Sequence, residues 1–309
     1  MSLFSIAIHG GAGTILREHL SPTMEQQYLA ALQIALQAGY TLLEQGAAAL
    51  DAVTAAVVAL EDCDLFNAGK GAVFNNAGMH ELDAAIMEGR SLAAGAVAGV
   101  QQVRNPVLLA KAVMQHSEHV LLSGNGALQF AEEQGLQIEP DTYFYSDFRY
   151  QQWLQVRNAE TTALDHNIQV QRKHGTVGAV ACDALGNVAA ATSTGGMTNK
   201  RYNRIGDSPL IGAGTYANNR TCAISCTGHG ELFIRTVAAY DVSCLMEYKG
   251  LTLQQAMEVV ALEKLVALQG EGGMIGVDAA GNCALVFNSA GMYRGYKKST
   301  GEEQVAIYR

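Results

Sequence analysis

Hydrophobic residues recur at helical spacing in several stretches of the first half of the chain, with short apolar segments between them. From residue 24 to residue 44, apolar side chains such as Tyr28 and Leu32 fall on one face of a helix, and Ser21-Pro22-Thr23 before them is a helix-start signal. The same spacing predicts further helices at residues 48–60, 107–114 and 127–134. Apolar segments predict strands at residues 4–9, 82–87 and 94–103.

After residue 176 short apolar segments alternate with small residues and are joined by turns. Asp183-Ala184-Leu185-Gly186-Asn187 and Ala279-Ala280-Gly281 are hairpin signals. The strands predicted in this half are residues 177–182, 188–194, 223–226, 273–278 and 282–287. Helical spacing returns at residues 230–248 and 252–268. Hairpins mixed with helices, rather than regular βαβ units, predict a layered α+β domain.

The two halves are joined by a stretch of different character. From Asp141 to Gln171 the chain is polar and aromatic, and from Asn158 to Lys173 it has no apolar stripe. We therefore predict a helix followed by a mobile linker over about residues 158–175.

The composition indicates a folded, acidic protein. Of the 309 residues, 49% are hydrophobic and 16% charged, so the chain can bury a large core in one domain or two, and a net charge of -9 disfavours nucleic acid and anionic membranes as partners. The N-terminus lacks a signal-peptide pattern, and the apolar run from Ala47 to Leu60 is too short to span a bilayer. The six cysteines include no CxxC pair. These features predict a cytoplasmic protein with buried, reduced thiols.

A threonine directly follows a glycine where the second half begins, at Gly175-Thr176-Val177-Gly178. A threonine hydroxyl is a poor nucleophile unless a base lies beside it, and the residue's own α-amine can be that base only at an N-terminus. Thr176 would therefore become a nucleophile only if the chain were cut after Gly175. A Gly-Thr pair at a strand start is usually structural, so other motifs must decide.

Further motifs occur in both halves of the chain. In the first half they are Ile8-His9-Gly10-Gly11-Ala12-Gly13, Leu65-Phe66-Asn67-Ala68-Gly69 and Leu82-Asp83-Ala84. In the second half they are Gly175-Thr176-Val177-Gly178, Thr194-Gly195-Gly196, Arg204-Ile205-Gly206-Asp207-Ser208-Pro209 and Thr227-Gly228-His229-Gly230-Glu231. With these motifs the chain resembles the plant-type L-asparaginase/isoaspartyl peptidase family over nearly its whole length.

The resemblance implies a fold and an activity. The fold would be the four-layer αββα sandwich of the N-terminal-nucleophile hydrolases, with residues 1–309 as a single domain. The activity would be hydrolysis of β-aspartyl dipeptides and of L-asparagine to L-aspartate. The precursor would cut itself between Gly175 and Thr176 into residues 1–175 and 176–309, and two cleaved units would form an (αβ)2 assembly. No organic cofactor is implied.

Four residues of the second half would act at the reacting bond. The resemblance implies that Thr194 hydrogen-bonds Thr176 and orients it, and that Thr227 and the backbone N–H of Gly228 stabilise the negative charge that develops on the substrate oxygen. The simpler interpretations are a β-forming Thr194 at a strand edge and a helix cap by Thr227.

Two charged residues would bind the free amino-acid end of the substrate. An Arg-x-x-Asp pair is usually a surface ion pair, but beside such a nucleophile the resemblance implies that Arg204 holds the α-carboxylate and Asp207 the α-amine. Gly230 and Asn67 would complete this pocket. Asn203 stands where related sequences often carry glycine, and it adds bulk beside Arg204.

Residues 60–70 resemble the family's loop in which backbone carbonyls hold a structural sodium ion. The carbonyls would be those of Leu60, Glu61, Cys63, Phe66, Ala68 and Lys70. His9, His174 and His229 match no metal or triad pattern, so we interpret them as structural residues. The protonation state of His174, just before the predicted cut, is a candidate influence on the cleavage rate.

Three alternative functions remain at this stage. Within the superfamily they are a glycosylasparaginase, which is commonly exported, and a threonine endopeptidase, which needs a larger groove. From another class, a binding protein could hold a small anion in its glycine-rich loops with Thr176 inside an uncut chain.

Overall fold

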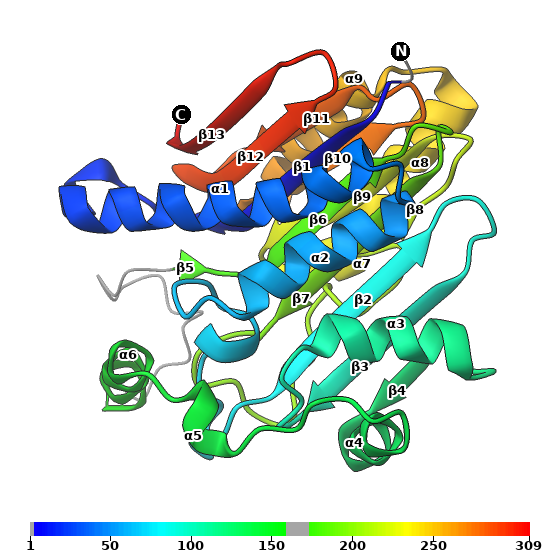
Figure 1. The fold of residues 1–309 in the computed structure, drawn as a ribbon. Helices are drawn as coiled ribbons and strands as arrows, with labels where there is room; N and C mark the ends of the chain where they lie inside the picture. Colours follow the sequence, from blue (N-terminus) through cyan, green and yellow to red (C-terminus); the bar gives the residue numbers. More distant parts are fainter. Residues whose placement is uncertain (1–2, 159–172) are drawn as a thin grey trace.

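The computed structural model describes residues 3–158 and 173–309, which form two β-sheets that pack against each other (Figure 1). Within these residues the larger sheet has nine strands in the order β13-β12-β1-β6-β7-β2-β3-β4, and β5 also pairs with β1. Their bounds are β1 Ser5–Gly13, β2 Leu82–Glu88, β3 Ala94–Val100, β4 Leu121–Ser123, β5 Lys173–His174, β6 Val177–Cys182, β7 Val188–Thr194, β12 Gly291–Lys298 and β13 Glu303–Tyr308. The smaller sheet has the order β11-β10-β9-β8, with β8 Thr215–Ala217, β9 Cys222–Gly228, β10 Gly272–Asp278 and β11 Cys283–Phe287.

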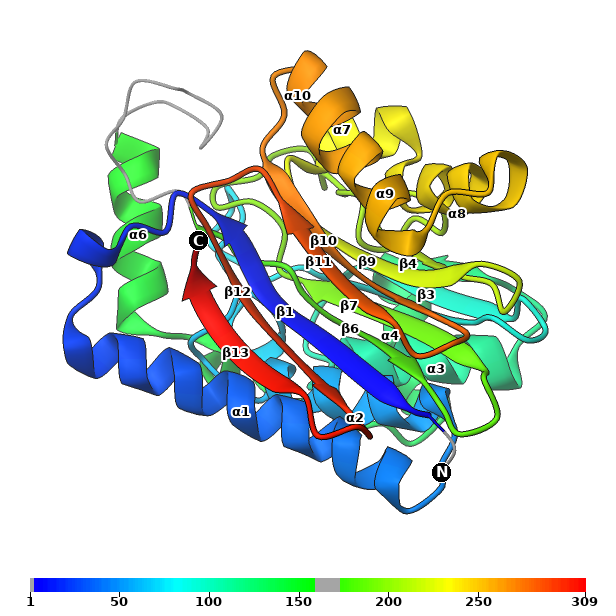
Figure 2. The same ribbon diagram turned by 90° about the horizontal axis from the view of Figure 1, so that it is seen from above.

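Helices cover the sides of the sheets that face away from each other (Figure 2). The larger sheet contacts α1 (Pro22–Glu44), α2 (Ala49–Glu61) and α3 (Pro106–His116), and the smaller sheet contacts α8 (Ala238–Lys249) and α9 (Leu253–Glu258). The other helices are α4 (Gly124–Glu133), α5 (Asp141–Phe144), α6 (Asp147–Asn158), α7 (Gly230–Thr236) and α10 (Leu265–Ala267). The predicted mixture of helices and antiparallel hairpins is therefore confirmed.

Side-chain alternation along the strands of the larger sheet produces two hydrophobic cores. On β6, Val177 and Ala179 belong to the core beneath α1, α2 and α3, whereas Val180 and Cys182 belong to the core shared with the smaller sheet. Successive strand residues point to opposite faces, so a strand buried on both sides is apolar throughout.

The predicted helices form, with changes at their boundaries. The Ser21 hydroxyl accepts a hydrogen bond from the backbone N–H of Met24 at 3.2 Å, which caps α1 as its start signal predicts. The single helix predicted at residues 230–248 is instead broken at Val237, whose φ and ψ of 49° lie in the left-handed region. The helix predicted at residues 252–268 begins at the Thr252 capping box, and a π-helical segment joins α9 to α10.

The strands β4, β5, β8, β12 and β13 have no counterpart among the predicted elements, and β5 falls inside the predicted linker. Most of the predicted linker, residues 159–172, lies outside the described part of the chain. No helix in the described ranges is long and apolar enough to cross a membrane.

Candidate active site

Thr176 directly precedes β6, and its hydroxyl donates a hydrogen bond to Thr194 Oγ1 at 3.1 Å. The pairing of β6 with β7 sets this contact, because Val177 lies opposite Ser193 and the next residues along are Thr176 and Thr194. Thr176 is 9% exposed and Thr194 is 2% exposed. The predicted nucleophile and its predicted orienting hydroxyl are thus adjacent in a site nearly closed to water.

Strand alternation directs threonines of both sheets into the layer between the sheets. On β7, Ala190 belongs to the core shared with the smaller sheet, so Thr194, four residues later, faces the same way. On β9, Ser225 contacts side chains of the larger sheet, so Thr227, two residues later, faces that sheet. Residues distant in sequence therefore meet in one buried layer.

The predicted cleavage point lies at an interruption of strand pairing. β1 pairs with β6 as far as His9 opposite Gly178, and with β5 from Ala12 opposite His174. Between these pairs, two residues of β1 lie opposite the three residues 175–177. A regular ladder cannot continue through such a mismatch, so the backbone around the Gly175–Thr176 bond departs from strand geometry.

Glycines make this interruption possible. A Cβ on Gly10 would overlap the Phe66 ring, and Gly11 has a φ of 113°, which side-chain-bearing residues rarely adopt. A Cβ on Gly175 would lie 2.5 Å from Asn67 Cβ. The glycines of both motifs therefore allow close packing around the bond that precedes Thr176.

Thr227 has the burial and the free hydroxyl expected of a group that binds substrate. Its hydroxyl is fully buried and lacks a hydrogen-bond partner in the described residues, which costs about 1–3 kcal/mol in a folded protein. The alternative role as a helix cap is wrong, because α7 begins at Gly230 with His229 at the cap position. Gly228 has a φ of 146°, and a Cβ there would overlap the Glu271 carbonyl.

Gly230 brings Arg204 and Asp207 together. A Cβ at Gly230 would lie 2.7 Å from Arg204 Nη2 and 2.8 Å from Asp207 Oδ1, so both charged groups flank its backbone. Asp207 is buried, and its Oδ2 accepts no hydrogen bond from the described residues. Arg204 Nε donates to Glu231 Oε1 at 2.8 Å. The three predicted residues form one polar cluster in which Asp207 still has an acceptor for a ligand.

Two carboxyls and two cations influence one another here. Burial raises the pKa of Asp207 to about 7, and the positive charge of Arg204 opposes this rise. Asp83 lies on β2, opposite Thr194 of β7. Burial also raises the pKa of Asp83, and the positive charges of Lys200 and Arg204 oppose this rise. Mixed charges in a buried setting suit a ligand that carries both an ammonium and a carboxylate.

Asn67 supports the turn that follows Thr194. Its Nδ2 donates to the Gly196 carbonyl at 2.7 Å, and its Oδ1 accepts from the Val73 N–H at 3.0 Å. Its backbone carbonyl accepts from the Gly195 N–H at 3.0 Å. Both the nitrogen and the oxygen of the Asn67 side-chain amide therefore form hydrogen bonds to backbone groups at the wall of the site.

Residues 2–307 match the family Asparaginase_2, described as asparaginase. The chain belongs to this family. It is 56% identical over 308 residues to an isoaspartyl peptidase of Salmonella typhimurium, covering 98% of each chain. It is 53% identical over 307 residues to an isoaspartyl peptidase of Escherichia coli, covering 98% of this chain and 96% of the relative. A probable isoaspartyl peptidase/L-asparaginase 2 of Arabidopsis thaliana is 38% identical over 329 residues, covering all of both chains.

The backbone at Asn203 suits the glycine that the resemblance leads us to expect there. Asn203 has a φ of 54°, in the left-handed region that glycine adopts freely. Asparagine is among the few other residues that tolerate this region. Asn203 can therefore keep the backbone path of a glycine in front of Arg204.

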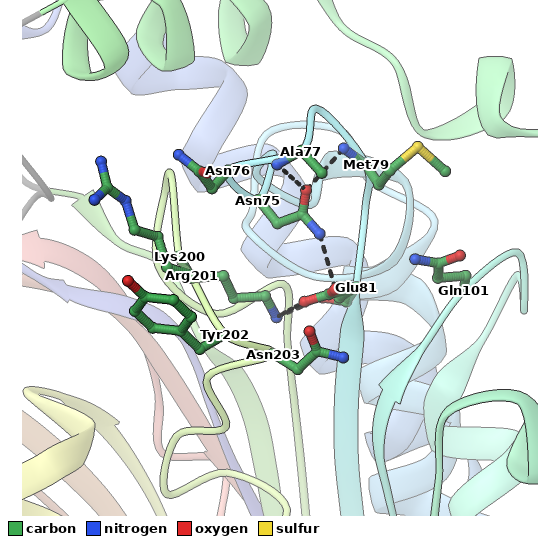
Figure 3. Close-up of a pocket in the computed structure, with 10 residues that line it drawn as sticks. All are labelled: Asn75, Asn76, Ala77, Met79, Glu81, Gln101, Lys200, Arg201, Tyr202 and Asn203. Atoms are coloured by element: carbon green, nitrogen blue, oxygen red, sulfur yellow. Dashed lines mark hydrogen bonds and ion pairs between the residues drawn. The ribbon is translucent and has the colours of Figure 1, made fainter. Parts of the chain in front are cut away.

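The side chain of Asn203 lines a polar cavity of about 370 Å³ (Figure 3). Figure 3 shows Lys200 and Asn75 converging on Glu81: Lys200 Nζ lies 3.5 Å from Glu81 Oε2, and Asn75 Nδ2 donates to Glu81 Oε1 at 2.8 Å. The other lining residues are Asn76, Ala77, Met79, Gln101, Arg201 and Tyr202. The bulk that Asn203 adds relative to glycine is thus accommodated at this cavity.

The predicted sodium loop presents carbonyl groups to a buried cation of the protein itself. Arg149 of α6 is 2% exposed, and its guanidinium donates to the carbonyls of Gly71 at 2.9 Å and Leu65 at 3.4 Å. Among the predicted sodium ligands, the carbonyls of Phe66 and Ala68 each accept one backbone N–H, and the carbonyl of Leu60 accepts two. A carbonyl oxygen has a second lone pair, so the loop has the donor type that a sodium ion needs.

The prediction from sequence assigned no role to Asp83, Lys200 or Glu231. Asp83 is a fully buried carboxylate near the start of β2 and is followed by four apolar residues, which is a signal that the sequence carries. Glu231 closes one of the motifs, but only the fold shows that it binds Arg204. Among the described residues, no cluster of His, Cys, Asp and Glu could hold a metal ion.

Proposed function

We propose that this chain is a hydrolase that releases L-aspartate from β-aspartyl dipeptides and from L-asparagine, with Thr176 as its nucleophile. The observation that carries the proposal is the Thr176–Thr194 hydroxyl pair in a buried layer beside the Arg204–Asp207 cluster. Asp83 links the two parts, because it lies opposite Thr194 and within electrostatic reach of Arg204 and Asp207. The names of the bacterial and plant relatives support the same activity.

The reaction has two steps. Thr176 Oγ1 attacks the side-chain carbonyl carbon of the aspartyl group, and the hydroxyl proton passes to the α-amine of Thr176. Thr227 and the Gly228 N–H donate to the oxygen that becomes negative. Collapse gives a β-aspartyl ester on Thr176, and the proton moves from the ammonium to the departing amine or ammonia. Water then attacks the ester, with the α-amine again as base, and aspartate leaves.

The α-amine becomes available only when the Gly175–Thr176 bond is cut. We propose that Thr176 Oγ1 attacks the Gly175 carbonyl carbon, that an ester replaces the amide, and that water hydrolyses this ester. The interrupted strand pairing at this bond supports the step, because no regular ladder opposes its distortion. Residues 1–175 and 176–309 would remain one domain, a four-layer αββα sandwich of the N-terminal-nucleophile type, and two such units would form an (αβ)2 assembly.

Arg204 and Asp207 would select the free amino-acid end of the substrate. A guanidinium binds a carboxylate through two parallel hydrogen bonds, and a carboxylate binds an ammonium. The substrate carboxylate would replace Glu231 on Arg204, and its ammonium would meet the unpaired Oδ2 of Asp207. Gly230 leaves the space between them free.

Three further points belong to the same proposal. The enzyme uses no organic cofactor. A sodium ion would bind the carbonyls of the loop at residues 60–70 and stabilise the wall that carries Asn67. The protein acts in the cytoplasm.

The function is tested by combining intact-mass analysis with assays of the purified protein. We expect two fragments, the second beginning at Thr176, and aspartate release from both a β-aspartyl dipeptide and L-asparagine. Hydrolysis of an N-acetylglucosaminyl-asparagine alone would indicate the glycosylasparaginase alternative, and cleavage only of longer peptides would indicate the endopeptidase. An uncut chain that hydrolyses none of these substrates would indicate the binding protein.

The activity is expected to fall steeply below pH 7. Asp207 must be ionised to bind an ammonium and has a pKa of about 7, while the Thr176 amine, with an ordinary pKa of about 8, must be neutral to act as base. With both groups protonating, kcat/KM should fall by about a hundredfold per pH unit on the acid side. In Asp207→Asn the fall should be about tenfold per unit, because one titrating group remains.

Initial rates from pH 5 to 9 measure these slopes. The surface variant Asp51→Asn should keep the steeper slope, and an unchanged slope in Asp207→Asn would contradict the role of this carboxyl. Asp207 also affects stability: its pKa in the folded chain is above the ordinary value of 3.8, so its stabilising contribution is complete below that pH and is lost as the pH rises to about 7.

A further inference from the structure

His9 connects the nucleophile of the larger sheet to the smaller sheet. It lies on β1 and is fully buried. Its Nδ1 is 3.0 Å from the backbone carbonyl oxygen of Thr176, and its Nε2 is 2.8 Å from Ser225 Oγ on β9. The reaction described above gives this side chain no role.

The partners of His9 determine which ring nitrogen carries the proton. Burial lowers the pKa of His9 to about 3, so the imidazole is neutral near pH 7 and has a single N–H. The Thr176 carbonyl can only accept a hydrogen bond. Nδ1 must therefore be the donor to Thr176, and Nε2 must accept from the Ser225 hydroxyl.

This assignment fixes the direction of a longer chain of hydroxyl groups. Ser225 uses its proton on His9, so the 2.7 Å contact with Thr192 Oγ1 requires Thr192 to donate to Ser225. Thr192 has then used its own proton, so Thr215 donates to Thr192 across 2.6 Å. All the donors in the chain point toward the Thr176 carbonyl, an arrangement in which each hydrogen bond polarises the next.

The far end of the chain lies at the segment that follows Asp207. Thr215 Oγ1 is also 3.0 Å from the Ser208 carbonyl, and the Asp207 carbonyl accepts from the Leu210 N–H at 3.0 Å. Because the single proton of Thr215 is donated to Thr192 and a carbonyl can only accept, the hydrogen-bond chain ends at Thr215, beside the loop that carries one of the predicted substrate-binding carboxyls.

The contact between His9 and Ser225 requires glycine at position 178, the second glycine of the Gly-Thr-Val-Gly motif. A Cβ on Gly178 would overlap Ser225 Oγ and would lie 2.5 Å from His9 Nε2. Only glycine leaves room for the imidazole to cross from β1 over β6 and reach β9. The structure thus explains why residue 178 is glycine, although the proposed chemistry gives this residue no role.

We propose that His9 is a positioning residue for Thr176, placed at the end of the directed hydrogen-bond chain from Thr215 through Thr192 and Ser225. The proposal rests on the proposed function. The hydrogen bond to the carbonyl restrains rotation about the Thr176 Cα–C bond, which sets where the hydroxyl and the α-amine point. Loss of this restraint lowers kcat and leaves substrate binding by Arg204 and Asp207 nearly intact.

The test compares two substitutions at His9. In His9→Asn the amide nitrogen takes the place of Nδ1 and can still donate to the Thr176 carbonyl, whereas in His9→Gln the amide reaches the Nε2 side and retains only the Ser225 contact. We expect His9→Gln to lower kcat at least about tenfold, as for one lost hydrogen bond, with KM changed less than about threefold. His9→Asn should lower kcat less than about threefold.

A matched pair of serine variants tests the rest of the chain. Ser225→Ala removes the donor to His9 and should lower kcat about threefold to tenfold. Ser243→Ala is its control, because Ser243 forms a similar buried hydroxyl pair with Thr221 at 2.6 Å outside the chain. Rates are normalised to the cleaved fraction by intact mass, and melting temperatures show which variants keep the fold.

The outcomes separate this proposal from the proposed function. An inactive wild-type protein would overturn the function itself. Active wild type with equal kcat in His9→Asn and His9→Gln would overturn the positioning role alone. If both variants fail to fold, ¹⁵N NMR of histidine-labelled wild type decides: a proton on Nδ1 of His9 supports the proposal, and a proton on Nε2 overturns it.

Discussion

Replacing Thr176 with alanine is expected to leave a single chain of about 32.7 kDa and to lower kcat for a β-aspartyl dipeptide by a factor on the order of 10⁴ or more. The methyl group cannot attack either the Gly175 carbonyl or the substrate, so self-cleavage and hydrolysis disappear together. Intact-mass analysis and aspartate release measure the two effects on one sample.

Two further variants separate the chemistry from the fold. Thr176→Ser keeps a hydroxyl and should still produce both fragments, whereas Thr300→Ala, in the exposed turn between β12 and β13, should behave as wild type. Fragments or substantial turnover in Thr176→Ala would show that another group is the nucleophile.

Arg204→Ala is expected to lower kcat/KM at least about thirtyfold, because removing one partner of a hydrogen-bonded charge pair that the substrate buries costs about 2–5 kcal/mol. Most of the loss should appear as a higher KM, since the carboxylate is bound equally before and during the reaction. Arg204→Lys should recover part of the loss, because it restores the charge without the planar, two-pronged geometry. Steady-state kinetics with a β-aspartyl dipeptide measure both parameters.

Arg220→Ala is the matched control for this prediction. Its side chain is 77% exposed and pairs with Glu247, so its removal should change neither kcat nor KM. Cleavage into fragments should persist in Arg204→Ala, because the proposed cut does not use the substrate pocket. A KM close to that of wild type would place the substrate carboxylate elsewhere.

The helices and hairpins most clearly predictable from sequence were those with a local cause. The Ser21 cap and the turn at residues 183–187 act between near neighbours, so the sequence shows them directly. The break at Val237 has no such signal, because apolar spacing continues on both sides of it. The strand β12 carries charged residues toward its C-terminal end, and its pairing with β1 joins residues almost 300 positions apart. The strand β13 is only half-buried and pairs with β12 at the margin of the sheet.

The candidate site divides in the same way. Motif residues such as Thr176 and Arg204 could be predicted because the resemblance assigns roles to positions. Glu231 and Ser225 could not, because their partners come from other loops and from the other sheet. Contacts between the two sheets depend on how the sheets are stacked, and no local sequence pattern specifies that stacking.

The order of strands in the larger sheet determines whether the two polypeptides could separate after the proposed cleavage. After cleavage at Gly175, β1 would belong to the first piece, yet it lies between β12 and β6 of the second piece, which in turn lie beside further strands of their own. The two polypeptides would therefore be interleaved rather than docked. Separating them would require breaking the hydrogen bonds along both edges of β1. We therefore expect that the cleaved protein does not dissociate on dilution and that both polypeptides unfold in one cooperative thermal transition.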